Sequence, residues 1–454
     1  MAEPALPYDP SDRESILAYA ERLVGHSLHE VLDELPPVID FSGHKGGFGT
    51  VLERHYFRYE PNSRPEPDFV DAGIELKATP LKRSGRRLVA KERLVLGMID
   101  YMTLVSEEWE SSSFLAKNAH LLLVFYLHEV GTDPRDFLVK IVRLWDFPEA
   151  DLEVIRDDWQ AVVDKVRSGR AHEISEGDTL YLAACTKGST GADRREQPRS
   201  AEPAKPRAFS LKASYMNSII EDSLTRAAVA PRQEAVSVEE LRSGKTLEEV
   251  IHDRFLPYVG MTADDIAARL GVGIARGAKN FYAVLTKRIL GVEAGKSVAE
   301  FDKAGLTVRT IRLMPSGMPK ESVSFPAFDY CDLVQQQWEE SDLRDDLSRR
   351  FFFVIYQLDE GSVPSLLRTQ FWTMPAEDIE RHARECFERT IQLVREDKAD
   401  YLPRSADNKV CHVRPHGRNR QDVVPTPSGG LAVRKSFWLN QRYLAEQLAG
   451  GGDS

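Results

Sequence analysis

An internal repeat limits the fold of this chain more than any other feature of its sequence. Residues 299–309 align without gaps to residues 67–77, and both segments contain a phenylalanine followed by an Ala-Gly turn. Further matches follow in the same order along the chain; they pair 50–52 with 283–285, 121–126 with 351–356, 144–145 with 371–372, and 211–215 with 433–437. A collinear series of this kind indicates that a whole domain is duplicated. We therefore expect one domain at 1–230, a linker at 231–246 and a second copy at 247–454.

Each copy is predicted to be a mixed α/β domain, with a mixed sheet flanked by helices. Residues 121–127 form a continuous apolar run between polar residues, which is typical of a strand buried on both faces. Residues 137–145 and 179–186 predict further strands, whereas 93–105 and 149–166 predict helices. This alternation of strands and helices favours the α/β class.

Residues 189–206 have the composition of a linker, because they are rich in proline, arginine, serine and glutamate. The repeat, however, aligns them with 414–430, inside the second copy. We therefore predict a long loop within the first domain, of the kind that often carries function.

The composition fits a folded protein that lies outside membranes. Hydrophobic residues make up 42% of the chain, and no apolar run is long enough to span a bilayer. The N-terminus lacks the basic and apolar regions of a signal peptide, so we expect a soluble, cytoplasmic protein. The 4 cysteines are scattered singly, which indicates neither a disulfide framework nor a zinc site.

The charge distribution gives two opposed indications. The net charge of -11 argues against nucleic acid as a partner. Basic residues nevertheless gather in 77–93, 187–212 and 404–442, while the acids lie largely elsewhere. A basic groove on an acidic body is one interpretation, and solvated basic loops are the other.

The segment 74–77 contains the strongest candidate for a reactive site. Its apolar and charged residues alternate, so a β-strand would point Glu75 and Lys77 out of one face and its apolar side chains into a core. A turn at 72–73 would bring Asp68 back beside Glu75. Two carboxylates with a lysine next to them can bind Mg²⁺ and orient a water that attacks a phosphate.

The same residues allow a second interpretation, because an exposed strand with an ordinary ion pair gives the same pattern. The repeat bears on this choice. The second copy has Glu300, Thr307 and Arg309 at these positions, and threonine cannot replace a carboxylate as a metal ligand. A scaffold that lacks these acids favours a chemical role for them in the first copy.

Several motifs occur in a fixed order from Lys45 to residue 127. They are His-Lys-Gly-Gly-Phe-Gly at 44–49 followed by Leu-Glu at 52–53, Pro-Asp-Phe at 67–69, Gly-Ile-Glu-Leu-Lys-Ala-Thr-Pro at 73–80, and Lys-Glu-Arg-Leu-Val-Leu at 91–96. This series resembles the MutH/Sau-type restriction endonucleases. The two-domain length is similar to the Sau-type enzymes and differs from the single-domain MutH nickase.

This resemblance implies two tandem copies of a PD-(D/E)xK restriction-endonuclease-like, MutH-like domain. It implies Mg²⁺-dependent cleavage of double-stranded DNA at GATC, on the 5′ side of the G, in a cell that also holds a cognate DNA methyltransferase. The family's catalytic residues carry over to Asp68, Glu75 and Lys77, with the two acids as metal ligands. A further helix glutamate carries over to Glu53, and a further lysine to Lys117.

The resemblance also suggests residues that contact DNA. The family's base-reading region corresponds here to Lys187 and Lys212, and its counterparts in the second copy fall near Arg414 and Arg434. Lys45, in the glycine-rich loop, is another DNA-binding candidate, although a tight turn before a helix explains those glycines equally well.

By the same resemblance, the second copy is a degenerate DNA-binding or allosteric domain without an active site. One active site cuts one strand per engagement. Cleavage of both strands therefore predicts either a dimer on DNA or two sequential nicks.

Two other functions compete with this hypothesis. Residues 262–272, followed by 279–290, have the composition of a helix-turn-helix, which would suit a non-enzymatic regulator. The repeat assigns this segment to the scaffold instead. A mismatch-repair nicking endonuclease would use the same chemistry, but the second copy argues against it.

Overall fold

The computed structural model describes residues 6–32, 47–61, 65–85, 87–188, 192–224 and 231–450. The chain divides into two compact units. The first consists of Met1–Ala230, Ser237–Thr246 and Asp302–Gly305; the second consists of Pro231–Val236, Leu247–Phe301 and Leu306–Ser454. Across the described residues, no helix has the length and apolar character needed to cross a membrane.

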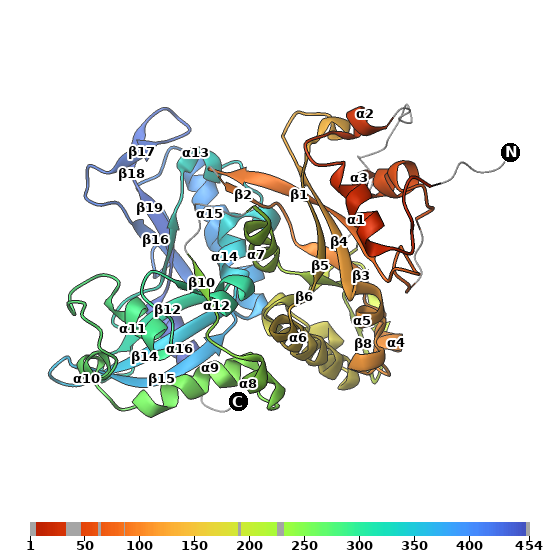
Figure 1. Ribbon diagram of the computed structural model, residues 1–454. Coiled ribbons are helices and arrows are strands. Elements are labelled where there is room, and N and C mark those ends of the chain that lie inside the picture. The colour runs from red at the N-terminus through yellow and green to blue at the C-terminus, as the bar shows by residue number, and fades with distance from the viewer. Residues whose placement is uncertain are drawn as a thin grey trace. The chain divides into compact units, whose positions relative to one another are not determined.

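The first unit is built on a mixed sheet in the order β2-β1-β4-β5 (Figure 1). Its strands are β1 (Glu75–Ser84), β2 (Arg87–Ala90), β4 (His120–Leu127) and β5 (Val139–Asp146). β1 runs parallel to β4, with Glu75 opposite Leu121, and β5 runs antiparallel to β4. The side chains at 121–125 have no exposed surface, which confirms that this apolar run is a strand covered on both faces.

Helices supply this cover. They are α1 (Arg13–Glu21), α2 (Leu28–Val31), α3 (Gly47–Val51), α4 (Tyr101–Leu104), α5 (Ser113–Asn118), α6 (Glu149–Arg167), α7 (Ala213–Leu224) and α8 (Val238–Arg242), with a π-helical turn η1 (Leu52–Tyr56) after α3. Ile16 of α1 and Leu52 of η1 share one apolar core with Ile74 and Leu122 from the sheet. This core fixes η1 against the start of β1.

A second sheet in this unit corrects one prediction. Its order is β3-β9-β6, with β3 (Leu94–Met98), β6 (Leu182–Thr186) and β9 (Arg207–Leu211). The predicted helix at 93–105 is wrong, because its first half forms β3 and only α4 is helical. The side chains of Leu94 and Leu96 are both buried, as expected for alternate residues of a strand. β3 pairs with β9, which lies far away in the sequence, so local sequence signals cannot reveal this pairing.

The predicted long loop at 189–206 contains a hairpin of its own, formed by β7 (Arg195–Gln197) and β8 (Ser200–Ala204). The hairpin lies between β6 and β9 in the chain. The turn at its tip includes Arg199 with φ +59°, a left-handed conformation that few residues other than glycine adopt.

The second unit has the same order of strand pairings. β12 (Thr307–Leu313), β14 (Phe351–Leu358) and β15 (Pro364–Trp372) form one sheet, β13 (Ser324–Ala327), β19 (Lys435–Leu439) and β16 (Cys411–Pro415) form another, and β17 (Val423–Pro425) pairs with β18 (Leu431–Val433). β12 is parallel to β14, with Thr307 opposite Phe351, and β15 is antiparallel to β14. The side chains at 351–356 have no exposed surface.

The helices of this unit include the segment that resembled a DNA-binding motif. They are α9 (Leu247–Phe255), α10 (Ala263–Arg269), α11 (Phe281–Ile289), α13 (Tyr330–Leu333), α14 (Asp342–Ser348), α15 (Arg384–Arg395) after the π-helix η8 (Asp378–Ala383), and α16 (Gln441–Ala449). Thr262, the residue that caps α10, forms a β-bridge with Ser365 of β15. The segment is therefore joined to the sheet scaffold.

Strand positions also correct one match of the internal repeat. β9 and β19 are the central strands of their sheets; Leu211 pairs with Leu182, and Leu439 pairs with Cys411. Lys435 thus occupies the position of Arg207. The sequence match of 433–437 with 211–215 is wrong by six positions, because short apolar segments align equally well in either register.

Candidate active site

A tight turn positions the first candidate acid. Phe69 and Ile74 form a β-bridge, in which the amide of Phe69 donates to the carbonyl oxygen of Ile74 at 2.9 Å. Gly73 closes the turn with φ +67°, a conformation that glycine adopts without strain. The chain therefore reverses direction between Asp68 and Glu75, as the sequence predicts.

The two acids meet at the start of β1. The amide of Asp68 donates to Oε2 of Glu75 at 3.2 Å, and the amide of Leu76 donates to Oδ2 of Asp68 at 2.9 Å. Each carboxylate thus accepts a backbone hydrogen bond from the segment that carries the other. This exchange fixes both side chains next to each other.

Two lysines approach the same carboxylate. Nζ of Lys77 lies 2.6 Å from Oε1 of Glu75, and Nζ of Lys117 lies 3.5 Å from that oxygen. Lys117 comes from α5, which leads into β4, and the parallel pairing of β4 with β1 brings α5 to the start of β1. The structure therefore joins Lys117 to the site across about forty residues of sequence.

Burial of the site differs from the expectation of an outward-facing strand surface. Only 3% of the Glu75 side chain is exposed, and α3 packs against β1. Burial raises the pKa of Glu75 to about 7; Lys77 acts in the opposite direction, and Asp68 raises it further. Glu53 on η1 responds in the same way: burial and then Asp68 raise its pKa, against Lys77.

Arg13 on α1 supports the turn, although sequence reasoning did not single it out. Its Nε donates to the carbonyl oxygen of Ala72 at 3.0 Å, and its Nη1 lies 3.3 Å from Nδ1 of His120. His120 in turn lies 2.5 Å from Asp146. These partners are remote from each other in the sequence, so no local pattern identifies the group.

The carboxylates suit a hard divalent cation such as Mg²⁺. Glu53 and Glu75 each interact electrostatically with Asp68, and burial disfavours the ionised forms of Glu53 and Glu75. A divalent cation would stabilise those ionised forms, and carboxylate oxygens are its preferred ligands. Among the described residues, no three His, Cys, Asp or Glu side chains form a metal-binding group in advance.

The predicted DNA-contacting residues of the first unit lie at the β6–β9 sheet. Lys187 directly follows β6, and its amide donates to the carbonyl oxygen of Pro206 at 2.7 Å. Lys212 directly follows β9, and its ammonium group donates to the carbonyl oxygen of Thr179. Lys212 therefore has a structural partner within the unit. Lys45 lies outside the described residues.

The two candidates in the second unit lie near the β17–β18 hairpin. The guanidinium of Arg414 lies 3.7 Å from the ring centre of Trp438, an arrangement typical of a cation–π contact. Nε of Arg434 lies 3.2 Å from Oδ1 of Asp422, at the base of the hairpin. Arg414 is exposed, whereas Arg434 is half-buried.

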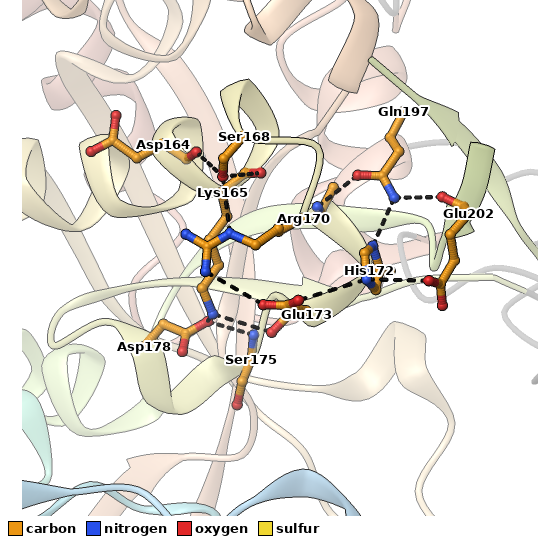
Figure 2. Close-up of polar contacts among 11 residues, drawn as sticks. Asp164, Lys165, Ser168, Arg170, His172, Glu173, Ser175, Asp178, Gln197 and Glu202 are labelled. Carbon is orange, nitrogen blue, oxygen red and sulfur yellow. Dashed lines mark hydrogen bonds and ion pairs between the residues drawn. The ribbon is translucent and has the colours of Figure 1, made fainter. Parts of the chain in front are cut away.

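Polar contacts anchor the corresponding hairpin of the first unit (Figure 2). Gln197 of β7 is buried; its Oε1 accepts from the amide of Ala171 at 2.7 Å, and its Nε2 lies 2.9 Å from Nδ1 of His172. The imidazole also lies 3.4 Å from Glu202 of β8. The turn end of this hairpin is therefore fixed to the segment that follows α6.

In the second unit, the start of β12 corresponds to the start of β1, but it carries different side chains. Oε1 of Glu300, on α12 (Ala299–Ala304), accepts from the amides of Ala235 and Val236, both at 2.8 Å. Thr307 begins β12 where Glu75 begins β1. Burial lowers the pKa of Arg309 and raises that of Asp346 on α14.

The sequence resemblance predicts an acid on a turn followed by Glu-x-Lys on a strand, and the structure has this arrangement at the start of β1. The family model for the DNA mismatch repair enzyme MutH matches residues 57–158, which include Asp68, Glu75, Lys77 and Lys117.

Individual proteins give the same result. The chain is 31% identical over 462 residues to the type II restriction enzyme Sau3AI of Staphylococcus aureus, covering 89% of this chain and 92% of that enzyme. It is 30% identical over 217 residues to the DNA mismatch repair protein MutH of Yersinia enterocolitica and 25% identical over 220 residues to that of Shewanella woodyi; these cover 46% and 47% of this chain, and 92% and 93% of the MutH proteins. The chain belongs to the MutH/Sau-type endonuclease family.

Proposed function

We propose that the protein is a type II restriction endonuclease that hydrolyses double-stranded DNA at GATC, 5′ of the G, with Mg²⁺. The observation that carries this proposal is the pairing of Asp68 with Glu75 at the start of β1, with the ammonium groups of Lys77 and Lys117 at 2.6 and 3.5 Å from Glu75. Similarity to a restriction enzyme extends over 89% of the chain, far beyond the site itself.

The proposed roles follow from the positions of these side chains. Asp68 and Glu75, with Glu53 beside them, hold the cation; when bound, Mg²⁺ supplies Lewis-acid stabilisation of charge on the phosphate and on the leaving 3′-oxygen. Lys77 orients the attacking water or removes its proton, and Lys117 stabilises negative charge on the phosphate. The low exposure of Glu75 excludes bulk water, which strengthens each of these interactions.

We further propose that the second unit is a second copy of the same domain, one that binds DNA or acts allosterically and has no active site. The shared strand order, the hairpin in the same position and the parallel pairings of β1 with β4 and β12 with β14 support it. Lys187 and Lys212 in the first unit, and Arg414 and Arg434 in the second, are the proposed DNA contacts. One active site per chain then requires a dimer on DNA or two sequential nicks.

The test is incubation of the purified protein with supercoiled plasmid and Mg²⁺, followed by sequencing of the product ends. Asp68→Ala and an excess of EDTA are the controls, and a plasmid methylated at GATC tests protection by a cognate methyltransferase. We expect discrete fragments that end 5′ of GATC, absent in both controls. Open circles alone would support the mismatch-repair type of nickase, and an intact plasmid would contradict any nuclease.

A further inference from the structure

The backbone after α3 brings Tyr59 back to Glu53. The π-helical turn η1 (Leu52–Tyr56) is followed by Arg58 in a left-handed conformation, with φ +60°. This turn allows the amide of Tyr59 to donate to the carbonyl oxygen of Glu53 at 2.9 Å. π-Helical turns are rare and occur frequently at functional sites, and a left-handed arginine costs conformational energy that the surrounding structure must offset.

Aromatic packing fixes the ring of Tyr59 beside the acidic site. The ring lies edge-on to that of Phe69, with 5.4 Å between the ring centres. Phe69 directly follows Asp68 and forms the bridge that closes the turn. The ring of Tyr59 is therefore held between Glu53, through its backbone, and the segment that carries Asp68.

The hydroxyl group of Tyr59 is buried and has no hydrogen-bond partner among the described residues. Its neighbours in the same aromatic cluster differ: the hydroxyl of Tyr8 donates to the carbonyl oxygen of Phe57 at 2.7 Å, and that of Tyr56 donates to the carbonyl oxygen of Tyr19 at 2.8 Å. A buried hydroxyl without a partner is unfavourable. Packing alone does not explain it, because phenylalanine would fill the same space.

Three carboxylates interact electrostatically with this hydroxyl. Burial raises the pKa of Tyr59 well above its ordinary value, and Asp68, Glu53 and Glu75 raise it further. Tyr59 is thus a neutral O–H donor beside acids. Asp68 and Glu75 already accept hydrogen bonds from Leu76 and Lys77, whereas the carboxylate of Glu53 accepts none from the described residues.

We propose that Tyr59 is a positioning residue of the active site: its hydroxyl donates a hydrogen bond to the Glu53 carboxylate when a divalent cation is bound, and so orients that carboxylate toward the cation. The inference rests on the proposed function of the same site. It assigns to this buried hydroxyl a partner that it lacks among the described residues.

The test compares Tyr59→Phe with Tyr8→Phe in the full-length chain. Both variants remove one hydroxyl from the same aromatic cluster. Thermal unfolding is measured without metal and across a series of Mg²⁺ and Ca²⁺ concentrations, Ca²⁺ affinity is measured by calorimetry, and the Mg²⁺ dependence of cleavage is measured at saturating DNA.

Tyr59→Phe is expected to unfold without metal at the wild-type temperature or slightly above it. Its metal-induced rise in Tm should be smaller, its Ca²⁺ affinity several-fold weaker, and its half-maximal Mg²⁺ concentration several-fold higher, with KM for DNA unchanged. Tyr8→Phe should show the reverse pattern: a lower Tm without metal and a wild-type response to metal.

A wild-type metal response in Tyr59→Phe, beside a wild-type chain that binds metal and cuts DNA, overturns this inference alone. The inference also fails if the metal-free Tm of Tyr59→Phe falls as far as that of Tyr8→Phe, because the hydroxyl then has a structural role. A wild-type chain that neither responds to metal nor cuts DNA overturns both this inference and the proposed function.

Discussion

β1 and β12 have the same strand order and pairing in their sheets, but the side chains at their first residues differ in chemistry and in their neighbours. At β1, Glu75 is buried and surrounded by Asp68, Lys77 and Lys117. At β12, Thr307 takes the place of the acid. Both sheets are fully formed, so the acids of the first unit are not needed to build such a sheet.

The acids that precede the two strands show the same contrast. Asp68 lies beside Glu75 and accepts a single backbone hydrogen bond through Oδ2. Glu300 is buried and accepts from two backbone amides, which ties 235–236 to α12. The charge of Glu300 is therefore stabilised by two backbone amides, whereas Asp68 has a second acid, Glu75, next to it. Placing two acids together is unfavourable for folding; the ammonium groups of Lys77 and Lys117 offset part of this cost, and the proposed divalent cation would offset more of it.

Glu75→Gln tests this contrast most directly, against Glu300→Gln as its counterpart. Glu75→Gln should reduce cleavage by about 10⁴-fold, because the amide removes the charge that holds the cation. Glu300→Gln should keep cleavage within a few-fold and lower the free energy of unfolding by about 2 kcal/mol, because a charged acceptor of buried amides is lost. Plasmid cleavage rates and urea titrations measure the two effects.

We therefore expect Glu75→Gln to lose activity and keep its stability, and Glu300→Gln to keep its activity and lose stability. Loss of cleavage in Glu300→Gln at full stability would show that the second unit also takes part in chemistry. Circular dichroism of both variants, compared with the wild type, checks that the loss of activity is not unfolding.

Lys77→Met and Arg309→Met make the same comparison for the cations, with a smaller effect. Lys77→Met should reduce cleavage by about 10³-fold, because the donor beside Glu75 that orients water is lost. Arg309 is half-buried, and burial lowers its pKa, so its replacement by an apolar side chain of similar length should leave both cleavage and Tm nearly unchanged. Equal losses of activity in both variants would contradict the assignment of one active site per chain.

Local signals in the sequence were enough for the central part of the site. The alternation at 74–77, the glycine at 73 and the apolar run at 121–127 each depend on neighbouring residues only, and the structure has the strand, the turn and the buried strand at these places. The pairing of Asp68 with Glu75 follows from the turn alone, because seven residues suffice to close it.

What the sequence did not reveal depends on partners that are far apart in the chain. The local sequence at 93–105 predicts a helix, and it cannot indicate strand β3, because the partner strand β9 lies more than one hundred residues later. The alternation at 74–77 predicts a solvated face for Glu75, but its side chain is 3% exposed and α3 packs against β1. Arg13 donates a hydrogen bond to Ala72, and Gln197 accepts one from Ala171. Both bonds join segments whose proximity no local sequence pattern indicates. The catalytic and DNA-binding roles of the named residues stay predictions.

Asp158 and Asn408 extend the comparison of the two units to their stability. Asp158 of α6 is fully buried and accepts from the amides of Leu180, Tyr181 and Leu182 at 2.6 to 2.8 Å, just where β6 begins. Asn408 performs the same task before β16, accepting from the amides of Val410 and Cys411 at 2.9 and 3.1 Å. One group ionises and the other cannot.

Stability should therefore depend on pH through Asp158. Burial raises its pKa to about 6, above the ordinary value near 4, although the three amides act against this. The folded state binds the proton more tightly, so this contribution is fully present below about pH 4 and is lost as the pH rises through 6, on the order of 3 kcal/mol in total.

Asp158→Asn removes this dependence, because asparagine does not titrate. Urea unfolding between pH 4.5 and 7.5 should show a wild-type stability that falls with pH more steeply than that of the variant. Parallel slopes for the two proteins would show that Asp158 keeps an ordinary pKa in the folded state.

The smallest difference is expected at the tyrosines of α7 and α16. The hydroxyl of Tyr215 donates to Oδ2 of Asp151, and that of Tyr443 donates to Oδ2 of Asp378, both at 2.9 Å. Asp151 is buried, with 2% exposed, whereas Asp378 is half-buried. Tyr215→Phe should lower the free energy of unfolding by about 2 kcal/mol, because a buried acid loses a donor, and Tyr443→Phe by about 0.5 kcal/mol, because water reaches Asp378. Urea titrations of the two variants at one pH measure the difference. Equal losses would mean that burial of the acceptor does not determine how much this hydrogen bond contributes to stability.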